Sequence, residues 1–318
     1  MSLDIGGVIS QMEMVSLPIL LGYALNRLDM MDETFDLKLT SLVLNVTLPC
    51  TVLSSLSSAS DVPDRASVLL LMAQMSLAML VAWGIAAVMA RLLRVPRDVE
   101  GAYRFAMMFG NAGFIGFPVI SSILCPDALL LAALASIPGN VFMFTVGASM
   151  FSRRRGSSNA VGPRAMLGGL LASLRTPTTL ASLAALACTL IGVSDFGIVG
   201  DAMFVVGQMS TPSALLIVGS SLARYNPLDM IDNPKAYAAA AFRLLGIPLA
   251  SLLALRLLGA ESLAAAVIVL ECAMPVATNG TLYCVQSGMD ATPMMQVTFL
   301  SIAGSIATVP LVALLLGM

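Results

Sequence analysis

The chain has 318 residues, of which 58% are hydrophobic and only 11% are charged, and its formal net charge is −2. Its mean hydropathy is +0.93. This composition excludes an ordinary water-soluble domain and indicates an integral membrane protein. The chain has no histidine, which disfavours zinc-dependent hydrolases and membrane enzymes that use histidine as a general base.

The predicted elements are membrane-spanning helices. About 20 apolar residues cross a bilayer as a helix, and the sequence contains ten such segments separated by short loops. The first follows Met1-Ser2-Leu3-Asp4 without a basic region and contains Glu13 and Pro18, so we expect a span and no cleavable signal peptide. The ten predicted spans are 8–26, 36–58, 66–90, 102–124, 128–151, 176–193, 199–223, 236–258, 262–286 and 293–317.

Isolated polar residues and prolines interrupt several spans. Pro49 in the second span and Pro212 in the seventh predict kinks. Gln74 in the third span and Gln208 in the seventh are secondary site candidates, and their alternative role is hydrogen bonding between helices. Asn140, which follows Pro138-Gly139 in the fifth span, is a further secondary candidate.

The fourth span carries the most informative motif, N-A-G-F-I-G-F-P over residues 111–118. Asn111, Gly113, Gly116 and Pro118 disfavour a continuous helix in apolar surroundings. Backbone that leaves a helix at membrane depth must be buried in protein or line a watery cavity. We therefore predict an unwound segment at a transport site, in preference to close helix packing through Gly113 and Gly116.

Residues 152–175 form the longest hydrophilic segment and are rich in Arg, Gly and Ser. They predict a cytoplasmic linker between a first unit, 1–151, and a second unit, 176–318. We expect Arg153, Arg154 and Arg155 to lie against anionic membrane lipid.

The two units carry prolines at corresponding positions. Pro212 follows Pro49 by 163 residues, and Pro275 follows Pro118 by 157 residues. A unit with an odd number of spans must have its second copy upside down, so the pattern predicts inverted repeats of five spans each. Such repeats with broken helices are the sequence signature of a secondary transporter.

The eighth and ninth spans supply charged candidates. Glu271 lies within an apolar segment, where an ionisable group is costly and usually functional. It is the ion-coupling candidate, as a sodium ligand, a proton carrier or a partner of Arg243. For Arg243 the alternatives are snorkelling to the interface, pairing with Glu271, or holding a substrate carboxylate. Pro275, Asn279 and Gly280 then predict a second broken helix.

Two broken helices that cross at mid-membrane present amide groups to an anion and carbonyl groups to a cation. Asn111 and Asn279 are the side chains best suited to such a crossing, and they also suit helix capping. Sodium, held at Glu271 and Asn111, or a proton is the predicted coupling ion. No other cofactor is expected.

The distribution of the 16 basic residues predicts the orientation. With the N-terminus outside, all but Arg65, Arg243 and Arg256 lie in or beside cytoplasmic loops. The positive-inside rule therefore predicts that both termini are outside and that the span count is even.

Several segments resemble the auxin efflux carrier family, whose bacterial members include malonate and malate permeases. They are L-L-G-Y (20–23), L-V-L-N-V-T-L-P (42–49), F-G-N-A-G-F-I-G-F-P (109–118) and A-M-P-V-A-T-N-G-T-L-Y (273–283). The resemblance implies the inverted-repeat fold of the bile-acid/sodium symporters and the NhaA antiporter. It implies that Asn111, Pro118, Pro275 and Asn279 are crossing residues, and it is looser for Glu271, which stands where bile-acid symporters place a sodium-binding glutamate.

The sequence thus predicts an all-α integral protein of the cell (inner) membrane that transports small organic anions, such as malonate, malate or auxin-like acids, by alternating access. The alternatives are a sodium-coupled symporter of larger anions, a sensor that does not transport, and a membrane enzyme. An enzyme is disfavoured because the chain lacks D-D-x-x-D, H-E-x-x-H and G-x-S-x-G motifs. The expected partners are an organic anion, membrane lipids and a second copy in a homodimer; nucleic acid is not expected.

Overall fold

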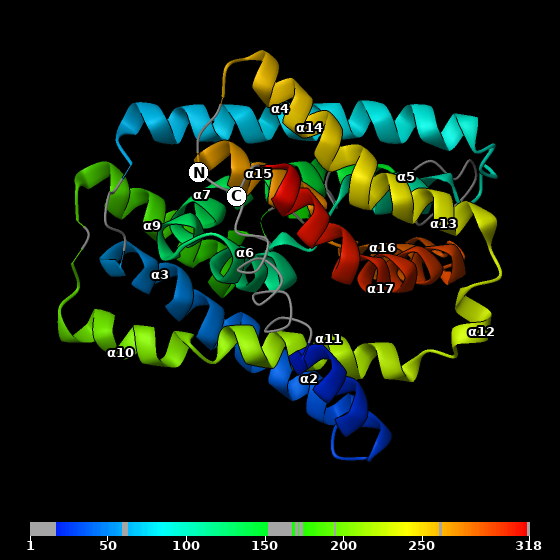
Figure 1. Cartoon of the computed structure of the whole chain (residues 1–318), viewed down its shortest axis with the longest axis horizontal. Coiled ribbons are helices and arrows are strands. Elements are labelled where there is room, and N and C mark those ends of the chain that lie inside the picture. The colour runs from blue at the N-terminus through cyan, green and yellow to red at the C-terminus, as the bar shows by residue number, and fades with distance from the viewer. Residues whose placement is uncertain are drawn as a thin grey trace.

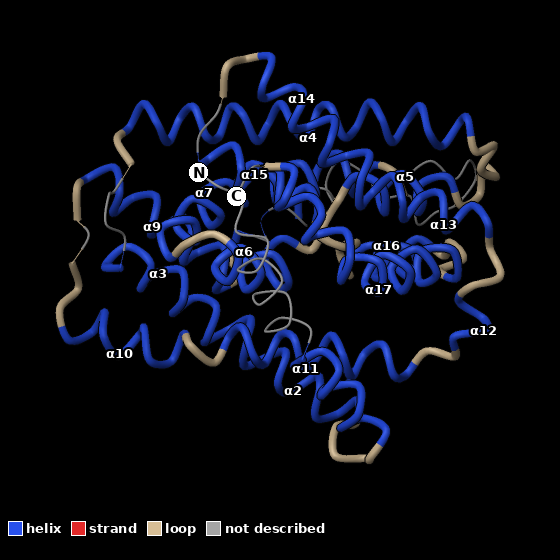
Figure 2. Tube along the Cα trace, in the orientation of Figure 1, coloured by secondary structure: helices blue, strands red, loops and turns tan. Residues whose placement is uncertain are grey.

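The structure is a computed structural model that describes residues 17–58, 63–151, 167–168, 171, 174–193, 195–260 and 263–316. Almost the whole of the predicted linker, including its three consecutive arginines, lies outside the described residues, as does the start of the first predicted span. Within the described ranges the regular structure is helical, apart from one isolated antiparallel bridge (Figure 2). The predicted all-α class is confirmed for this part of the chain.

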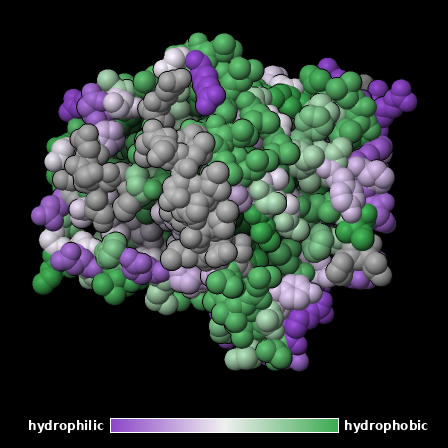
Figure 3. Space-filling view, in the orientation of Figure 1, coloured by the Kyte–Doolittle hydropathy of each residue, from purple (hydrophilic) through white to green (hydrophobic). Residues whose placement is uncertain are grey.

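Six helical segments of the described chain are long and apolar enough to cross a membrane, judged by length and composition. They are Glu33–Ser57, Arg65–Leu92, Ala128–Gly147, Ile198–Arg224, Pro234–Leu257 and Thr292–Leu315. Three shorter apolar helices are Ala112–Ile123, Pro177–Ile191 and Leu263–Ala273. Hydrophobic residues dominate the middle of the face seen in Figure 3, whereas hydrophilic residues gather toward its ends.

A helix over residues 17–27 comes first among the described elements. The helices that follow, with η marking π-helical turns, are α2 Glu33–Leu42, η1 Val43–Thr47, α3 Leu48–Ser58, α4 Arg65–Leu92, α5 Glu100–Met108, η2 Ala112–Gly116, α6 Phe117–Ile123, α7 Pro126–Phe142, η3 Met143–Gly147, α9 Pro177–Ile191, α10 Ile198–Gly207, α11 Ser210–Arg224, α12 Pro227–Met230, α13 Pro234–Ala241, η4 Phe242–Gly246, α14 Ile247–Leu257, α15 Leu263–Ala273, α16 Asn279–Ser287 and α17 Thr292–Leu315.

The helices pack in two groups. In the first group α3 lies against α9 and α10, and α2 lies against α11. In the second group α4 packs on α5, α7, α14 and α15, and α17 packs on α5, α13 and α15. The groups meet through α7, which contacts α3 and α9 of the first group. In Figure 1 α4 runs along one edge of the molecule, and α10 and α11 run along the opposite edge.

The first group is held together by close backbone contact and a buried charge. A Cβ added at Gly22 would lie 2.1 Å from the Leu216 carbonyl oxygen, and one at Gly219 would lie 1.8 Å from the Ile19 carbonyl oxygen. The helix 17–27 therefore touches α11 through its backbone. Near the end of α11, the buried carboxylate of Asp36 accepts hydrogen bonds from Ser220 and Arg224.

The two predicted proline kinks differ in structure. Helix α3 contains Pro49 and continues from α2 without a break, because the π-helical turn η1 immediately precedes it. A wider turn of this kind absorbs an irregularity in the helical hydrogen bonds. Pro212 instead lies in the first turn of α11, after α10 has ended at Gly207, where a proline replaces no helical hydrogen bond.

Candidate functional site

Two helices break and cross at the centre of the molecule. Helix α5 ends at Met108 and α15 ends at Ala273. The short links that follow run antiparallel and pair Gly110 with Val276. The Asn111 amide donates to the Pro275 carbonyl oxygen at 2.7 Å, and the Ala277 amide donates to the Phe109 carbonyl oxygen at 3.0 Å. The breaks predicted in the fourth and ninth spans are therefore present, and they lie side by side.

The extent of the first break differs from the prediction. The chain is non-helical only over residues 109–111, and the helix resumes at Ala112 as the π-helical turn η2. Gly113 and Gly116 are consequently helical, so the expectation that they are unwound was wrong. A Cβ on Gly113 would meet open space, whereas one on Gly116 would lie 3.1 Å from Met274 Cγ.

Pro118 and Pro275 do not occupy equivalent positions, contrary to the pairing inferred from their spacing. Pro118 is buried in the first turn of α6, whereas Pro275 belongs to the crossing link and accepts the hydrogen bond from Asn111. Gly280, in the first turn of α16, packs against Met294 and Phe105. The absence of a side chain at Gly280 therefore lets Met294 and Phe105 pack closely against the start of α16.

Arg243 lies at the crossing and is 1% exposed. Its Nε donates to the Met274 carbonyl oxygen at 2.9 Å, its Nη1 to that of Met108 at 2.8 Å, and its Nη2 to the main-chain carbonyl of Glu271 at 3.3 Å. Of the three alternatives predicted for Arg243, snorkelling to the interface is ruled out, because the guanidinium is buried. Its contact with Glu271 is also to the main chain and not to the carboxylate.

The Glu271 side chain is 2% exposed, and neither carboxyl oxygen has a hydrogen-bond partner among the described residues. It lies on the wall of the central cavity. A buried carboxylate without a partner is strongly disfavoured as an isolated anion. Glu271 is therefore placed where a proton or a cation would compensate its charge.

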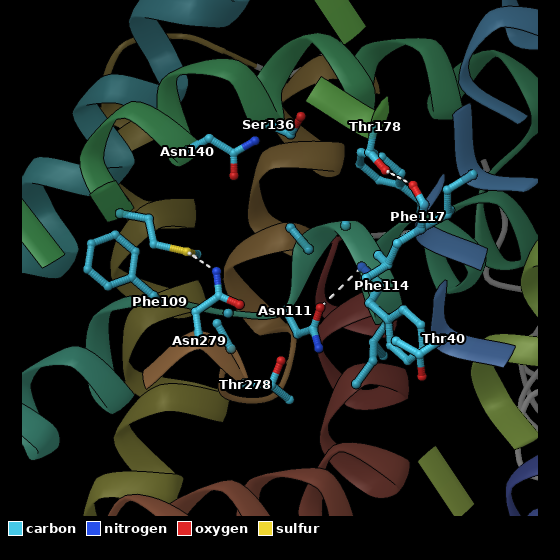
Figure 4. Close-up of a pocket in the computed structure, with 18 of the residues that line it drawn as sticks. Thr40, Phe109, Asn111, Phe114, Phe117, Ser136, Asn140, Thr178, Thr278 and Asn279 are labelled. Carbon is cyan, nitrogen blue, oxygen red and sulfur yellow. Dashed lines mark hydrogen bonds between the residues drawn. The ribbon is translucent and has the colours of Figure 1, made fainter. Parts of the chain in front are cut away.

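A cavity of about 560 Å³ reaches the crossing. Polar side chains from several helices face it, among them Asn111, Ser136, Asn140, Thr278 and Asn279 (Figure 4). Its lining also includes Glu33, Asp36 and Arg224 at the ends of α2 and α11. The cavity thus extends from one end of the first helix group to the middle of the molecule.

The two asparagines are held differently. Asn111 Oδ1 accepts the Phe114 amide at 3.1 Å and so caps the helix that begins at Ala112. Asn279 Nδ2 donates to Met143 Sδ at 3.4 Å, and a thioether is a weak acceptor that a ligand oxygen can replace. Figure 4 shows both side chains at the same cavity, each from a different broken helix.

The secondary candidates separate clearly. Asn140 lines the cavity, whereas Gln74 is buried on α4 beside it, with no partner for Oε1 in the described part of the chain. Gln208 lies after the end of α10 and is exposed, so it is not brought to the site. Sequence reasoning missed the hydroxyl groups of Ser136, Thr178 and Thr278, whose only signal was a polar residue within an apolar segment.

No cluster of three or more His, Cys, Asp or Glu side chains suitable for a metal ion occurs in the described ranges. A cation at the crossing would therefore depend on the Glu271 carboxylate, asparagine amides and main-chain carbonyls. Three of those carbonyls already accept hydrogen bonds from Arg243.

Comparison with known proteins identifies the family of the chain. A family model described as membrane transport protein matches residues 8–313, which is nearly the whole chain. A search of curated proteins found no match. The chain therefore belongs to the membrane transport protein family, which is that of the auxin efflux carriers.

Proposed function

We propose that the protein is a secondary transporter of small organic anions and that it binds them at the crossing of the two broken helices. The main support is the cavity that reaches the start of η2, capped by Asn111, and the start of α16 at Asn279. The amino end of a helix carries a partial positive charge, and its free amide groups bind anions. Neutral amide and hydroxyl side chains surround these ends.

The size of the cavity supports a small substrate. Its volume of about 560 Å³ falls within the range of small-molecule sites. The side chains on its wall combine hydrogen-bonding groups, such as Asn140 and Ser136, with aromatic rings, such as Phe109 and Phe114. A short-chain carboxylate such as malonate or malate, or an auxin-like acid, matches this combination.

We further propose ten spans in two inverted units, 1–151 and 176–318, joined by the cytoplasmic linker 152–175. The crossing supports this symmetry, since each unit contributes one broken helix and the links after the two breaks meet in an antiparallel bridge. The amide of Asn111 reaches the residue before Val276, and the amide of Ala277 reaches the residue before Gly110. Ser210 also donates a hydrogen bond to Thr47 at 2.9 Å across a separation of 163 residues, the same separation as that between Pro49 and Pro212.

We also propose that the protein lies in the cell membrane with both termini outside. The distribution of basic residues supports this orientation. In that orientation the cavity opens to the cytoplasm, because Asp36 and Arg224 lie at the cytoplasmic ends of their helices. Alternating access would expose the same crossing to the other side. A homodimer is the assembly we propose.

Glu271 is the proposed coupling residue, because its buried carboxylate lacks a partner at the cavity wall. A proton on the carboxyl group would remove the cost of burying the charge. Sodium held between Glu271 and Asn111 is the alternative. Either ion would enter from the cavity with the substrate.

Uptake of labelled malonate into proteoliposomes, under a proton gradient and separately under a sodium gradient, tests the proposal. We expect saturable uptake under one gradient, its loss in Asn279→Ala, and its retention in Glu100→Gln, a carboxylate distant from the crossing in α5. If a folded protein takes up neither malonate nor an aromatic carboxylate under either gradient, or in exchange for internal anion, the organic-anion assignment is wrong.

A further inference from the structure

The carboxyl ends of both broken helices converge on one side chain. The last carbonyl groups of a helix have no partner within the helix and carry a partial negative charge. Here three carbonyls accept from Arg243: that of Met108 at the end of α5, that of Glu271 in the last turn of α15, and that of Met274 directly after α15. In broken-helix transporters, such carbonyls are the groups that coordinate a coupling cation.

The guanidinium is well suited to this position. Its charge is permanent, and its nitrogens form a rigid planar fork. Each of its three nitrogens contacts a different carbonyl, and these carbonyls come from two helices that are far apart in the chain. Arg243 itself belongs to a third helix, at the π-helical turn η4, a type of irregularity that is frequent at functional sites.

We propose that Arg243 is a built-in cation that takes the place of a metal ion at the carbonyl ends of the crossing and holds the two links in register. We assign it a positioning role, because each of its three nitrogens donates to a main-chain carbonyl of the crossing. The crossing is thereby polarised: the carbonyl ends are neutralised, and the amide ends remain for an anion. This role does not depend on which anion is carried.

The three hydrogen bonds from Arg243 to the main chain form a clamp on the crossing, and a glycine at position 110 leaves room for it. A Cβ added at Gly110 would lie 1.9 Å from Arg243 Nη2 and 2.9 Å from its Cζ. Any side chain at Gly110 would therefore displace the guanidinium from its carbonyls. Gly110 also pairs directly with Val276 in the bridge, so the clamp and the crossing links share the same space.

Hydrogen exchange with chemical rescue tests the proposal without a substrate. The Asn111 and Ala277 amides report on the bridge, because each donates across it. In purified Arg243→Ala we expect exchange at these two amides to accelerate by at least roughly tenfold, the factor expected from losing a hydrogen bond to a charged group. Exchange in α10 and α11 should stay unchanged. Millimolar methylguanidinium, added through the cavity, should restore protection, whereas choline at equal ionic strength should not.

Arg256→Ala is the matched control, since Arg256 is an exposed arginine on α14, which continues from η4. It should leave both amides protected. Unchanged exchange in Arg243→Ala would overturn the clamp. Acceleration throughout the chain without rescue by methylguanidinium would show a general structural role and would equally overturn it.

A second variant covers failure of Arg243→Ala to fold. Arg243→Lys keeps the charge but loses the fork, so it cannot reach all three carbonyls together. We expect faster exchange at Asn111 and Ala277 only, by a smaller factor than in the alanine variant. Normal protection of both amides in Arg243→Lys would contradict the need for a three-way clamp.

Discussion

The side chain of Asn111 carries two different groups: its oxygen caps a helix, and its NH₂ group is a proposed donor to an anion in the cavity that Asn111 lines. Replacing Asn111 with aspartate keeps the acceptor for the Phe114 amide but adds a negative charge where an anion is proposed to bind. Like charges repel strongly in a partly desolvated site. We expect Asn111→Asp to keep wild-type thermal stability and to lose anion uptake by roughly tenfold or more, as measured in proteoliposomes.

Asn111→Ala is the complementary variant. It removes the cap, which costs about 1 kcal/mol of stability, but introduces no charge. It should therefore unfold at a lower temperature than Asn111→Asp while transporting more substrate. The reverse order of uptake would show that the residue matters as a cap and not as part of an anion site.

Glu271 and Asp36 are both buried acids, yet they should respond in opposite ways to loss of charge. The Glu271 carboxyl oxygens have no partner in the described structure, whereas Asp36 is bonded to Ser220 and Arg224. We expect Glu271→Gln to unfold at or above the wild-type temperature and to lose its response to the coupling gradient. Asp36→Asn should unfold at a lower temperature, because it breaks a charge pair in a buried setting. Thermal unfolding in detergent measures both.

A large fall in stability for Glu271→Gln would indicate that the carboxylate has a structural partner. If transport by the same variant still responds to the coupling gradient, the coupling ion must bind at another residue. The two measurements are independent, so each aspect of the residue is tested by itself.

Polar residues within apolar segments were the part of the site that sequence could reveal. The cavity wall includes Asn111, Asn140, Glu271 and Asn279. A polar group within a membrane span costs free energy and usually has a function, which is why the sequence could point to these residues. The role of Arg243 could not be predicted, because its partners are main-chain carbonyls whose position depends on how two distant helices end. Sequence shows which side chains are costly, but not which backbone groups they meet.

Helix breaks were predictable in place but not in form. Glycine and proline mark the fourth and ninth spans, and both spans do break. The extended links are nevertheless short, and Gly113 and Gly116 belong to a π-helical turn. The choice between extended chain and a wide helical turn depends on the opposing link, which supplies hydrogen bonds to residues 109–111 only. The spacing between Pro118 and Pro275 also suggested equivalent positions in the two units, whereas Pro118 lies in α6 and Pro275 lies in the crossing link.

Backbone contact between the helix 17–27 and α11 gives a prediction for an entire helix pair. A Cβ at Gly219 would lie 1.8 Å from the Ile19 carbonyl oxygen, so Gly219→Ala must push the helices apart. Overpacking of this kind costs about 1–3 kcal/mol. We expect a lower thermal unfolding temperature in detergent, and a similar fall for Gly22→Ala.

Gly84→Ala is the matched control, because nothing lies within 4 Å of a Cβ added there and alanine is the better helix former. Its unfolding temperature should equal or exceed that of the wild type. Equal stability of Gly219→Ala and Gly84→Ala would show that this helix pair is not closely packed in the membrane.

At the scale of the whole molecule, two cavities of very different size lie next to each other among the described residues. The large cavity of about 560 Å³ reaches the crossing, and a second of about 30 Å³ is lined by apolar residues including Ile19, Met274 and Val309. Ile115, Val218 and Ile302 line both. These three side chains, one from each of η2, α11 and α17, therefore lie between the two cavities, and we expect them to form a partition that closes the path from the large cavity to the other side of the membrane.

Cysteine labelling tests this asymmetry. In a cysteine-free background, Thr178→Cys places a thiol on the large cavity and Val309→Cys places one on the small cavity. A membrane-impermeant maleimide should modify the first only from the face that carries Arg94 and Lys235, the cytoplasmic face in the proposed orientation. It should not modify the second from that face, because the small cavity of about 30 Å³ has room for little more than a water molecule.

The same experiment then locates the partition. If Ile115, Val218 and Ile302 seal the path, Val218→Gly should open it, so that Val309→Cys becomes reactive from the cytoplasmic face while Thr178→Cys is labelled at its former rate. Labelling of Val309→Cys from the cytoplasmic face in the unaltered background would contradict the partition, whereas labelling from the opposite face would report the second state that alternating access requires. A carrier needs one intact barrier in every state, so the glycine variant should also leak malonate down its gradient without a coupling ion.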